Sequence, residues 1–550
     1  MSKRKHQIEA YFRQGQQLHA AGRLGEADQV YRQVLAAVPD HADSLHMLGV
    51  VALQAGQPET ALHWFDRAIA VRPPAAGSAA HSAAQTAAAV YHVHRAHALL
   101  ALGRPGDALA ACQRALQLRR NSAEASFAMG HALSDLGRPE DAIAAYRTAL
   151  RQNPALPDLA NSLALALREA NKLEDAAGVL QAGLDRNPAD ELARENLASL
   201  QKDLGRLDTA EALYRDLLRR HPDNPMTHYN LGVLLLLAGR FAEAWPEWDW
   251  RFQADASLAR PMAGPLWQGE PLDGRTLLVY AEQGLGDMLQ FCRYLPLLPQ
   301  GARVVLEVHA PLVRLLGQLP NIAAVTPIGT VPPPCDLRCP MLSLPRLLGT
   351  RTEADIPAQT PYLFADPALV ARWRQRTAPL PGVRVGIVWA GNPARARMDR
   401  HRSIPAAWLA GLNSIPGISL VSLQVGTAAA ELHGTGLTET GLTETGLAET
   451  GLAGAVHDWT AELGDFAETA ALIETLDLVI GVDTAVVHLA GALGKPVWLL
   501  NRFDTCWRWL LGRDDSPWYP TLRQFRQPRP GDWATVIERL RAALTAEVSG

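Results

Sequence analysis

Residues 481 to 491 read Gly-Val-Asp-Thr-Ala-Val-Val-His-Leu-Ala-Gly, and this stretch predicts a strand that passes directly into a helix. The apolar run Asp477 to Val482 has the β-branched character of a buried parallel strand, and the alanine-rich residues after it are helical in period. Asp483 therefore falls where α/β sheets bind anionic ligands, at the carboxyl end of a strand and the amino end of a helix. Thr484 and His488, four residues apart, share one face of that helix. We expect a small ligand to lie against this face.

The length and the formal charge of the chain limit its number of domains and its expected partners. With 550 residues it is too long for one core, and two to four domains are expected. Lysine and arginine number 52 and aspartate and glutamate 56, for a formal charge of -4. This balance gives no bias towards polyanions, so nucleic acid is not an expected partner.

The cysteines and the amino-terminal sequence indicate the cellular compartment. Five scattered cysteines suit reduced thiols in a cytosol better than a disulfide framework. Cys335 and Cys339 have no second pair at zinc-finger spacing, so no metal site is predicted there. The basic start, Met1 to His6, leads into no apolar signal segment, and no window approaches the roughly 18 apolar residues of a membrane span. We expect a soluble, cytoplasmic protein.

The amino-terminal half is a repeat array. A glycine or asparagine recurs at intervals of 34, 47, 34, 34, 34 and 34 residues, at Gly22, Gly56, Gly103, Gly137, Asn171, Gly205 and Gly239. Alanine follows five residues after each, a mostly large residue nine after, and in five of the seven units a proline seventeen after. This pattern resembles the tetratricopeptide repeat, in which two helices form each unit. The long interval carries 13 extra residues around Pro73 to Ala89, which we interpret as an extended loop or a lengthened helix.

Stacked helical hairpins leave a concave groove, which in such arrays holds an extended peptide or a partner. The alternative is that the array only scaffolds or oligomerises the rest of the chain, and the fold itself does not decide between the two. In the seventh unit, the aromatic cluster Trp245 to Trp250 replaces the usual second helix. We expect these aromatics to seal the end of the array against the next domain.

From Thr276 onwards the pattern alternates between strand and helix. A first series begins with the strand Leu277 to Tyr280, and a second begins with Val383 to Trp389. The order of elements predicts an α/β fold with two Rossmann-like halves joined by a hinge. The near-perfect repeats of Thr-Gly-Leu-Thr-Glu at 434–454 are interpreted as an expanded surface loop without a catalytic role.

The first turn of the first half carries a candidate acid or base. It reads Glu-Gln-Gly-Leu-Gly-Asp over residues 282–287, so Gly284 and Gly286 let the backbone approach a ligand and Asp287 stands at a helix start. A dinucleotide fingerprint would need a third glycine where Leu289 stands. Asp287 has two interpretations: a cap of the helix or a carboxylate with a chemical role.

The first turn of the second half carries basic residues. Asn392 and Pro393 are followed by four arginines in eight residues, the last being Arg402. Ser403 is expected to cap the next helix, which has Pro405 near its first turn. Such a loop suits a diphosphate, and a solvated basic loop is the alternative.

Three segments, Ala281 to Pro296, Val385 to Pro405 and Leu476 to Leu499, together resemble bacterial glycosyltransferases of family 9, the ADP-heptose:lipopolysaccharide heptosyltransferase type, in a form fused to tetratricopeptide repeats. The resemblance covers most of residues 275–545, and Asp-Thr-Ala-x-x-His-Leu-Ala-Gly is its most specific part. The stretch Asn501 to Trp509 does not follow the family pattern.

The resemblance implies a metal-independent, inverting GT-B enzyme that binds the acceptor on its first half and the nucleotide sugar on its second. By motif, Asp287 resembles the general base and Arg402 the basic phosphate contact. Asn392, in the first turn of the second half, is also predicted to bind the donor. The donor-binding turn is carried by a set of four residues: Asp483, Thr484, Ala485 and His488. No Asp-x-Asp motif, typical of metal-dependent transferases, occurs in the chain.

The sequence thus predicts four regions: repeats at 1–255, a linker at 256–274, a first half at 275–378 and a second half at 379–550. The predicted function is transfer of a sugar from a nucleotide-diphosphate donor to a protein or glycan acceptor, without metal or other cofactor, with the repeats binding the acceptor or a partner. The alternative is a non-catalytic scaffold that binds nucleotide sugar.

Overall fold

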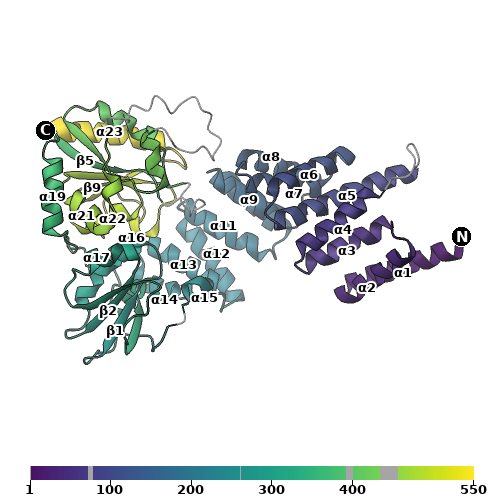
Figure 1. Cartoon of the computed structure of the whole chain (residues 1–550), viewed down its shortest axis with the longest axis horizontal. Helices are drawn as coiled ribbons and strands as arrows, with labels where there is room; N and C mark the ends of the chain where they lie inside the picture. The colour runs from purple at the N-terminus through teal and green to yellow at the C-terminus, as the bar shows by residue number, and fades with distance from the viewer. Residues whose placement is uncertain (1, 72–78, 261, 392–400, 434–455, 550) are drawn as a thin grey trace. The chain divides into compact units, whose positions relative to one another are not determined.

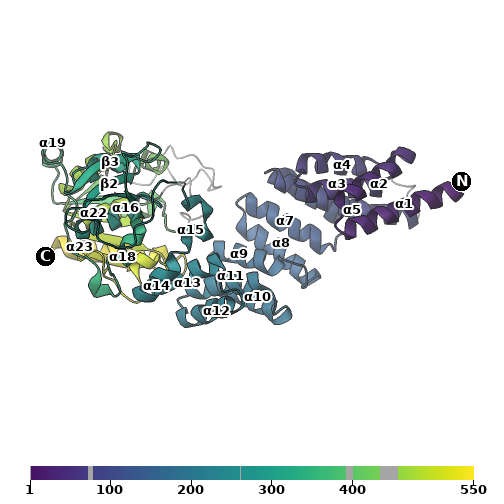
Figure 2. The same ribbon diagram turned by 90° about the horizontal axis from the view of Figure 1, so that it is seen from below.

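A computed structural model describes residues 2–71, 79–260, 262–391, 401–433 and 456–549 of the chain. The chain divides into two compact units, Met1–Leu200 and Gln201–Gly550. The division falls inside the repeat array, so the last repeat helices belong to the same unit as the α/β region (Figures 1 and 2).

The first unit is all-helical. Its helices are α1 (Ser2–Ala20), α2 (Leu24–Ala37), α3 (Ala42–Gln54), α4 (Pro58–Ala70), α5 (Ala79–Ala101), α6 (Pro105–Leu118), α7 (Ala123–Asp135), α8 (Pro139–Gln152), α9 (Leu159–Glu169) and α10 (Leu173–Arg186), and α11 (Glu191–Asp203) crosses the division between the units. Consecutive helices pair as hairpins, which confirms the predicted solenoid of tetratricopeptide repeats.

The repeat signature has a clear structural basis. All seven turn positions have left-handed backbone, with φ between 57° and 75°, which glycine and asparagine tolerate best. The alanines five residues later are fully buried. In four of the seven units the large residue nine after the turn packs on a glycine of the preceding helix; a Cβ on Gly49, for example, would lie 2.4 Å from Phe65, and one on Gly130 would lie 2.3 Å from Tyr146. These helix glycines are a second repeat signal, seven residues before the turn.

The long interval between repeats contains a lengthened helix. Helix α5 has 23 residues, whereas α3 and α7 at the equivalent place have 13. The alanine-rich sequence from Ala79 onwards favours a helix, since alanine has the highest helix propensity. Residues 72–78 lie outside the described part of the chain.

The repeat helices of the second unit are α12 (Leu207–Arg220), α13 (Pro225–Leu237), α14 (Phe241–Trp248) and α15 (Arg251–Ala254). The second helix of the seventh repeat is therefore shortened to eight residues, with Pro246 inside it, rather than replaced. Its aromatics do seal the array: Trp245 Nε1 donates to Thr350 O at 2.7 Å, and the Trp248 and Trp507 rings lie 5.8 Å apart.

Two parallel sheets follow. The first contains β1 (Thr276–Tyr280), β2 (Arg303–Val308), β3 (Ile322–Pro327) and β4 (Leu337–Pro340) in the order β3-β2-β1-β4. The second contains β5 (Val383–Val388), β6 (Ile418–Ser422), β7 (Val456–His457), β8 (Leu478–Val482), β9 (Val497–Asn501) and β10 (Leu522–Arg526) in the order β10-β9-β8-β5-β6-β7. The predicted α/β class with two Rossmann-like halves is confirmed. The second sheet has the doubly wound order, with its switch point between β5 and β8.

The helices of the α/β region are α16 (Leu285–Phe291), α17 (Val313–Leu316), α18 (Leu344–Leu347), α19 (Pro367–Thr377), α21 (Phe466–Glu474), α22 (Ala485–Ala492) and α23 (Trp533–Ser549). Helix α19, which the predicted boundary assigns to the first half, packs on α21 of the second, where Trp373 Nε1 donates to Glu468 Oε2 at 3.0 Å. The predicted loop at 434–454 lies outside the described residues.

One predicted cap is wrong. The helix after the basic turn is a 3₁₀ helix, Ala406–Ser414, and Pro405 rather than Ser403 precedes it. The Ser403 hydroxyl instead accepts a hydrogen bond from Gly391 N at 3.0 Å, because the chain returns to the end of β5 at this point.

Candidate active site at the meeting of two βα turns

The turn after β1 and the turn after β8 lie against each other. Helices α16 and α22, which these turns begin, are neighbours in both ribbon views (Figures 1 and 2). A Cβ built on Gly286 would lie 2.8 Å from His488 Cδ2 and 3.6 Å from Ala485 Cα. The bare backbone of Gly286 is therefore needed for the approach of the two predicted site turns.

Asp287 occupies the third position of α16, and its carboxylate has two protein partners. Its Oδ2 accepts from Gly284 N at 2.9 Å, as the acidic residue of a capping box does, and Gly284 is the N-cap. Its Oδ1 accepts from Arg508 Nη2. Asp287 thus stabilises the start of α16, but from the third position of the helix rather than as its N-cap. The role as a base is not tested by this geometry and stays a prediction.

Arg508 is a site residue that the sequence did not indicate. It lies in the 3₁₀ helix Trp507–Trp509 after β9, with its side chain 11% exposed. Its Nη1 donates to Cys506 Sγ at 3.0 Å, and its guanidinium lies 4.5 Å from the centre of the Trp507 ring. Burial lowers its pKa, but the charge of Asp287, the hydrogen bond to Cys506 and the charges of Cys506 and Asp483 together outweigh burial and raise the pKa. The only available signal was topological: the loop after β9 leaves the sheet beside β8.

Asp483 is the acidic centre of the second turn. Burial raises the pKa of its carboxyl, but the nearby His488 and the charges of Arg402 and Arg508 outweigh burial and hold the pKa at about 2. Asp483 Oδ1 lies 3.7 Å from His488 Nε2. The residue is therefore an anion over the whole physiological range and gathers cationic side chains around it.

His488 is held on three sides. Its Nδ1 shares a hydrogen bond of 2.9 Å with the Tyr519 hydroxyl, and its ring stacks on Trp509 with centroids 5.0 Å apart. Only 4% of the residue is exposed. This packing fixes the imidazole so that Nε2 faces Asp483.

Thr484 is the N-cap of α22, with extended backbone at φ -136° and ψ 167°. Its hydroxyl is buried and has no hydrogen-bond partner among the described residues. The first N–H groups of a helix also have no partner within the helix, Ala485 N among them. A hydroxyl and helix amides without protein partners are the groups that a bound anion satisfies.

Basic residues reach Asp483 from two loops. Arg402 is half-buried in the loop after β5, and its charge helps to lower the pKa of Asp483. Arg502, after β9, pairs with Asp504 at 3.5 Å; burial lowers its pKa, while the charges of Asp504 and Asp483 raise it. With Arg508, three arginines thus surround the donor-side turn. The predicted donor-binding Asn392 lies outside the described residues.

The last repeat also reaches this site. Tyr229 of α13 is half-buried, and its ring lies 5.4 Å from that of Trp248. Burial raises the pKa of Tyr229, and the charges of Arg508 and Asp287 act on the same phenol. Arg251 of α15 forms a bidentate pair with Glu282 of the β1–α16 turn, with both bonds at 3.0 Å. The turn that carries Asp287 is thus anchored to the repeat array of the same unit.

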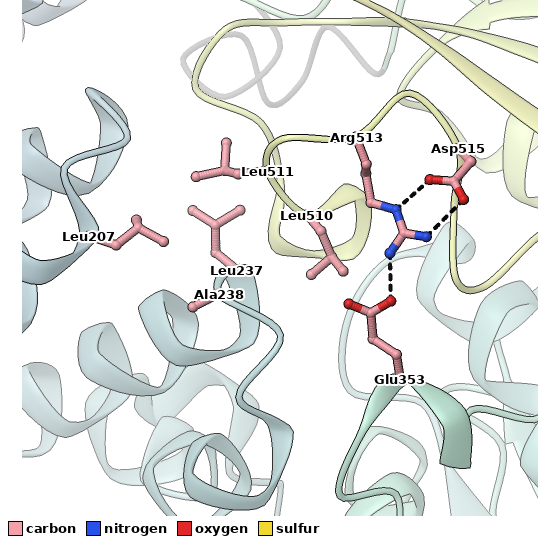
Figure 3. Close-up of a pocket in the computed structure, with 8 residues that line it drawn as sticks. All are labelled: Leu207, Leu237, Ala238, Glu353, Leu510, Leu511, Arg513 and Asp515. Carbon is pink, nitrogen blue, oxygen red and sulfur yellow. Dashed lines mark hydrogen bonds and ion pairs between the residues drawn. The ribbon is translucent and has the colours of Figure 1, made fainter.

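One pocket of the second unit has none of the predicted site residues in its lining. This pocket, of about 480 Å³, is lined by leucines of α12, α13 and the 510–511 segment, and by Arg513, which bridges Glu353 and Asp515 (Figure 3). Within the described part of the chain, no group of three His, Cys, Asp or Glu side chains is placed to hold a metal ion, and no helix is long and apolar enough to cross a membrane.

Family models match both parts of the chain. Tetratricopeptide-repeat models match residues 12–81, 127–191 and 195–255, with a second such model at 89–114. The model "glycosyltransferase family 9 (heptosyltransferase)" matches residues 460–500, which include the whole β8–α22 turn.

A curated relative, protein FlbA of Caulobacter vibrioides, is 28% identical over 337 residues, which are 56% of this chain and 53% of the relative. The chain therefore spans about half the length of the curated relative that it matches.

Three solved structures are similar to the helical part. PilF of Pseudomonas aeruginosa is 19% identical with a TM-score of 0.35, covering 46% of this chain and 99% of its own. TTC0263 of Thermus thermophilus is 21% identical with a TM-score of 0.29, covering 35% and 98%. YrrB, described as a tetratricopeptide-repeat protein with an unusual peptide-binding site, is 21% identical with a TM-score of 0.27, covering 33% and 88%.

Taken with the fold, these matches show a solenoid of tetratricopeptide repeats joined to an α/β region, in which residues 460–500 match the glycosyltransferase family 9 model.

Proposed function

We propose that the protein is a metal-independent, inverting glycosyltransferase that moves a sugar from a nucleotide-diphosphate donor to a protein or glycan acceptor. The observation that carries the proposal is the contact between the two turns. A carboxylate, Asp287, is positioned beside a helix terminus that has a partnerless hydroxyl and three arginines nearby. The family 9 match over the second turn supports the same reaction class.

The donor's diphosphate binds at the amino end of α22. Its oxygens accept from the Thr484 hydroxyl and from the first helix amides, including Ala485 N, which favour negative charge. Arg402, Arg502 and Arg508 supply positive charge, and guanidinium groups bind phosphate in a bidentate manner. These fixed charges and dipoles stabilise the leaving diphosphate in the role that a divalent cation has in other transferases.

Asp287 acts as the general base. Its carboxylate takes the proton of an acceptor hydroxyl, and the hydroxyl oxygen forms the new bond to the anomeric carbon of the sugar. The bond between that carbon and the phosphate oxygen breaks, and its electron pair leaves with the nucleoside diphosphate. Attack opposite the leaving group inverts the configuration of the sugar.

The repeats bind the acceptor or a partner of the enzyme. Tetratricopeptide arrays present a concave surface for such binding, and the charge of the proposed base acts on Tyr229 of the last repeat. A cytoplasmic location, where nucleotide sugars are available, is part of the same proposal. The alternative is a non-catalytic scaffold that binds nucleotide sugar, which needs no base.

Replacing Asp287 separates these alternatives. The purified chain is first offered ADP-, UDP-, GDP- and dTDP-sugars, and release of nucleoside diphosphate and thermal shift identify the donor. Asp287→Asn is then expected to lower transfer or donor hydrolysis by at least about 100-fold, because general base catalysis contributes factors of that order, while nucleotide binding is retained.

The matched control is Asp366→Asn. Asp366 caps α19 by accepting from Ala368 N, and asparagine caps equally well, so activity is expected to stay unchanged. Full turnover in Asp287→Asn would reject the assignment of the base. A wild-type chain that binds a nucleotide sugar but never transfers the sugar would favour the scaffold.

A further inference from the structure

Both carboxylate oxygens of Asp287 accept hydrogen bonds from protein groups in this structure. Transfer requires an acceptor hydroxyl to approach one of its oxygens. Oδ2 is held by Gly284 N, which is fixed by the start of α16, and Oδ1 is held by Arg508. Of these two partners only the arginine side chain can move without unwinding the helix, so the position of Arg508 controls how far Oδ1 is open to an acceptor hydroxyl.

Arg508 is also linked to the donor side. It belongs to the second half, whereas Asp287 belongs to the first, and its charge is felt at Asp483 beside the amino end of α22. Its remaining hydrogen bond, from Nη1, goes to the sulfur of Cys506, which is a weak acceptor. A phosphate oxygen is a much stronger acceptor for a guanidinium than a thiol sulfur.

We propose that Arg508 is a positioning residue that couples donor binding to release of the base. Without donor it pairs with Asp287. When a nucleoside diphosphate occupies the amino end of α22, the guanidinium turns to the diphosphate, and Oδ1 of Asp287 becomes free for the acceptor hydroxyl. The inference rests on the proposed function and predicts that donor binds before acceptor.

This coupling is reciprocal, and that makes it measurable at equilibrium. If diphosphate and Asp287 compete for Arg508, the negative charge of Asp287 opposes donor binding, and its removal strengthens binding. A residue with only a structural role gives the opposite sign, because damage to a site weakens binding. The coupling is therefore visible without any activity measurement.

The experiment is a double-mutant cycle read by calorimetry, with ADP, UDP, GDP and dTDP as probes. Asp287→Asn is expected to bind the preferred nucleoside diphosphate at least about 5-fold more tightly than the wild type, at the lower end of typical coupling between sites. Arg508→Ala is expected to bind it at least about 10-fold more weakly. In the Arg508→Ala background, Asp287→Asn is expected to have no effect on affinity.

Arg513→Ala is the matched control. Arg513 lies in the segment that follows Arg508, but it pairs with Glu353 and Asp515. Arg513→Ala should bind nucleoside diphosphate as tightly as the wild type does. Adding Asp287→Asn to it should strengthen binding by the same factor as in the wild-type background. Intrinsic tryptophan fluorescence verifies that each variant is folded, and Asp287→Asn alone decides the case if Arg508→Ala does not fold.

Unchanged or weaker binding in Asp287→Asn would overturn the coupling, as would a gain that persists in Arg508→Ala. These failures are separable from failure of the proposed function. Loss of transfer in Asp287→Asn with unchanged affinity rejects only the coupling, whereas transfer that survives in Asp287→Asn rejects the base. Absence of binding of all four probes to the wild type rejects both.

Discussion

The two βα turns of the site have similar backbones and opposite chemistry. The β1–α16 turn is saturated by groups of its own chain: Glu282 is bound by Arg251 and by Leu342 N, and Asp287 is bound by Gly284 N and Arg508. In the β8–α22 turn the Thr484 hydroxyl is buried without a partner among the described residues. The first turn is built to hold a carboxylate in place, and the second keeps a hydroxyl with which a ligand can form a hydrogen bond.

The difference follows from the cost of burying polar groups. A buried carboxylate needs a counter-charge and hydrogen bonds, so the first turn recruits arginines from α15 and from the segment after β9. A partnerless hydroxyl costs far less than a partnerless charge, and an unliganded site tolerates it. Both turns can therefore sit at sheet edges, but only the second is prepared for an incoming anion.

The largest effect is expected from a substitution that breaks the ion pair between Arg251 and Glu282, which anchors the first turn. Arg251 and Glu282 are both fully buried, and Arg251→Ala leaves the carboxylate of Glu282 without its counter-charge. We expect a loss of about 3–5 kcal/mol in the unfolding free energy of the second unit. Urea unfolding followed by tryptophan fluorescence measures this, because Trp64 is the only one of 14 tryptophans in residues 1–200.

Two further variants define the cause. Arg251→Ala with Glu282→Gln should recover part of the loss, since the uncompensated charge is then gone. Arg275→Ala, which removes a half-exposed arginine 3.8 Å from Glu270, should leave stability nearly unchanged. A loss below about 1 kcal/mol in Arg251→Ala would mean that the anchor is not needed.

A smaller effect is expected where the two turns touch. The Cβ of Gly286→Ala would enter the space of His488, which Trp509 and Tyr519 hold in place. We expect a loss of about 1–3 kcal/mol in the second unit, as is typical of overpacking, together with weaker binding of nucleoside diphosphate. Urea unfolding and calorimetry measure the two effects.

Gly284→Ala is the control within the same turn. Gly284 has φ -77°, and a Cβ there meets only Asp287 Oδ2, at an ordinary contact distance of 3.4 Å. We expect this variant to lose less stability and less affinity than Gly286→Ala, since the added Cβ displaces no ring and costs only the poorer N-cap. Equal effects of the two alanines would show that the turn needs flexible glycines in general, rather than space for His488.

The local features of the site could be predicted from sequence, and its pairings could not. Asp287 and Asp483 were found because glycines, strand residues and a helix start follow one another within a few positions. Arg508 contacts Asp287 across 221 residues, and its own neighbourhood, Cys-Trp-Arg-Trp, contains no pattern of spacing or period. Its role follows from the parallel pairing of β8 with β9, which only the fold reveals.

The same division applies to the fold. The repeats were predictable because a turn glycine or asparagine and the packing alanine recur in every unit, so that one local rule is applied seven times. Strand β10 was missed because Leu-Arg-Gln-Phe-Arg alternates with charge and lacks the apolar run of a central strand. It is one of the two edge strands of the sheet and pairs only with β9.

The smallest expected effect sharpens the contrast between the turns most directly. Thr484→Val keeps the shape and suits the extended backbone of the N-cap, but removes the hydroxyl that has no partner. The unfolding free energy of the unliganded protein should therefore stay the same or rise slightly, while affinity for nucleoside diphosphate falls about 3- to 10-fold, the value of one hydrogen bond.

Thr505→Val should behave in the opposite way. The Thr505 hydroxyl accepts from Asn501 Nδ2 at 2.8 Å and donates to Asn501 Oδ1 at 3.0 Å. Its loss leaves Nδ2 with Gln524 but takes the donor away from the buried Oδ1, which destabilises the fold. Urea unfolding and calorimetry on both variants form the comparison. If Thr484→Val costs as much stability as Thr505→Val and leaves nucleotide affinity unchanged, then the hydroxyl of Thr484 serves the fold. In that case the second turn is no more prepared for a ligand than the first.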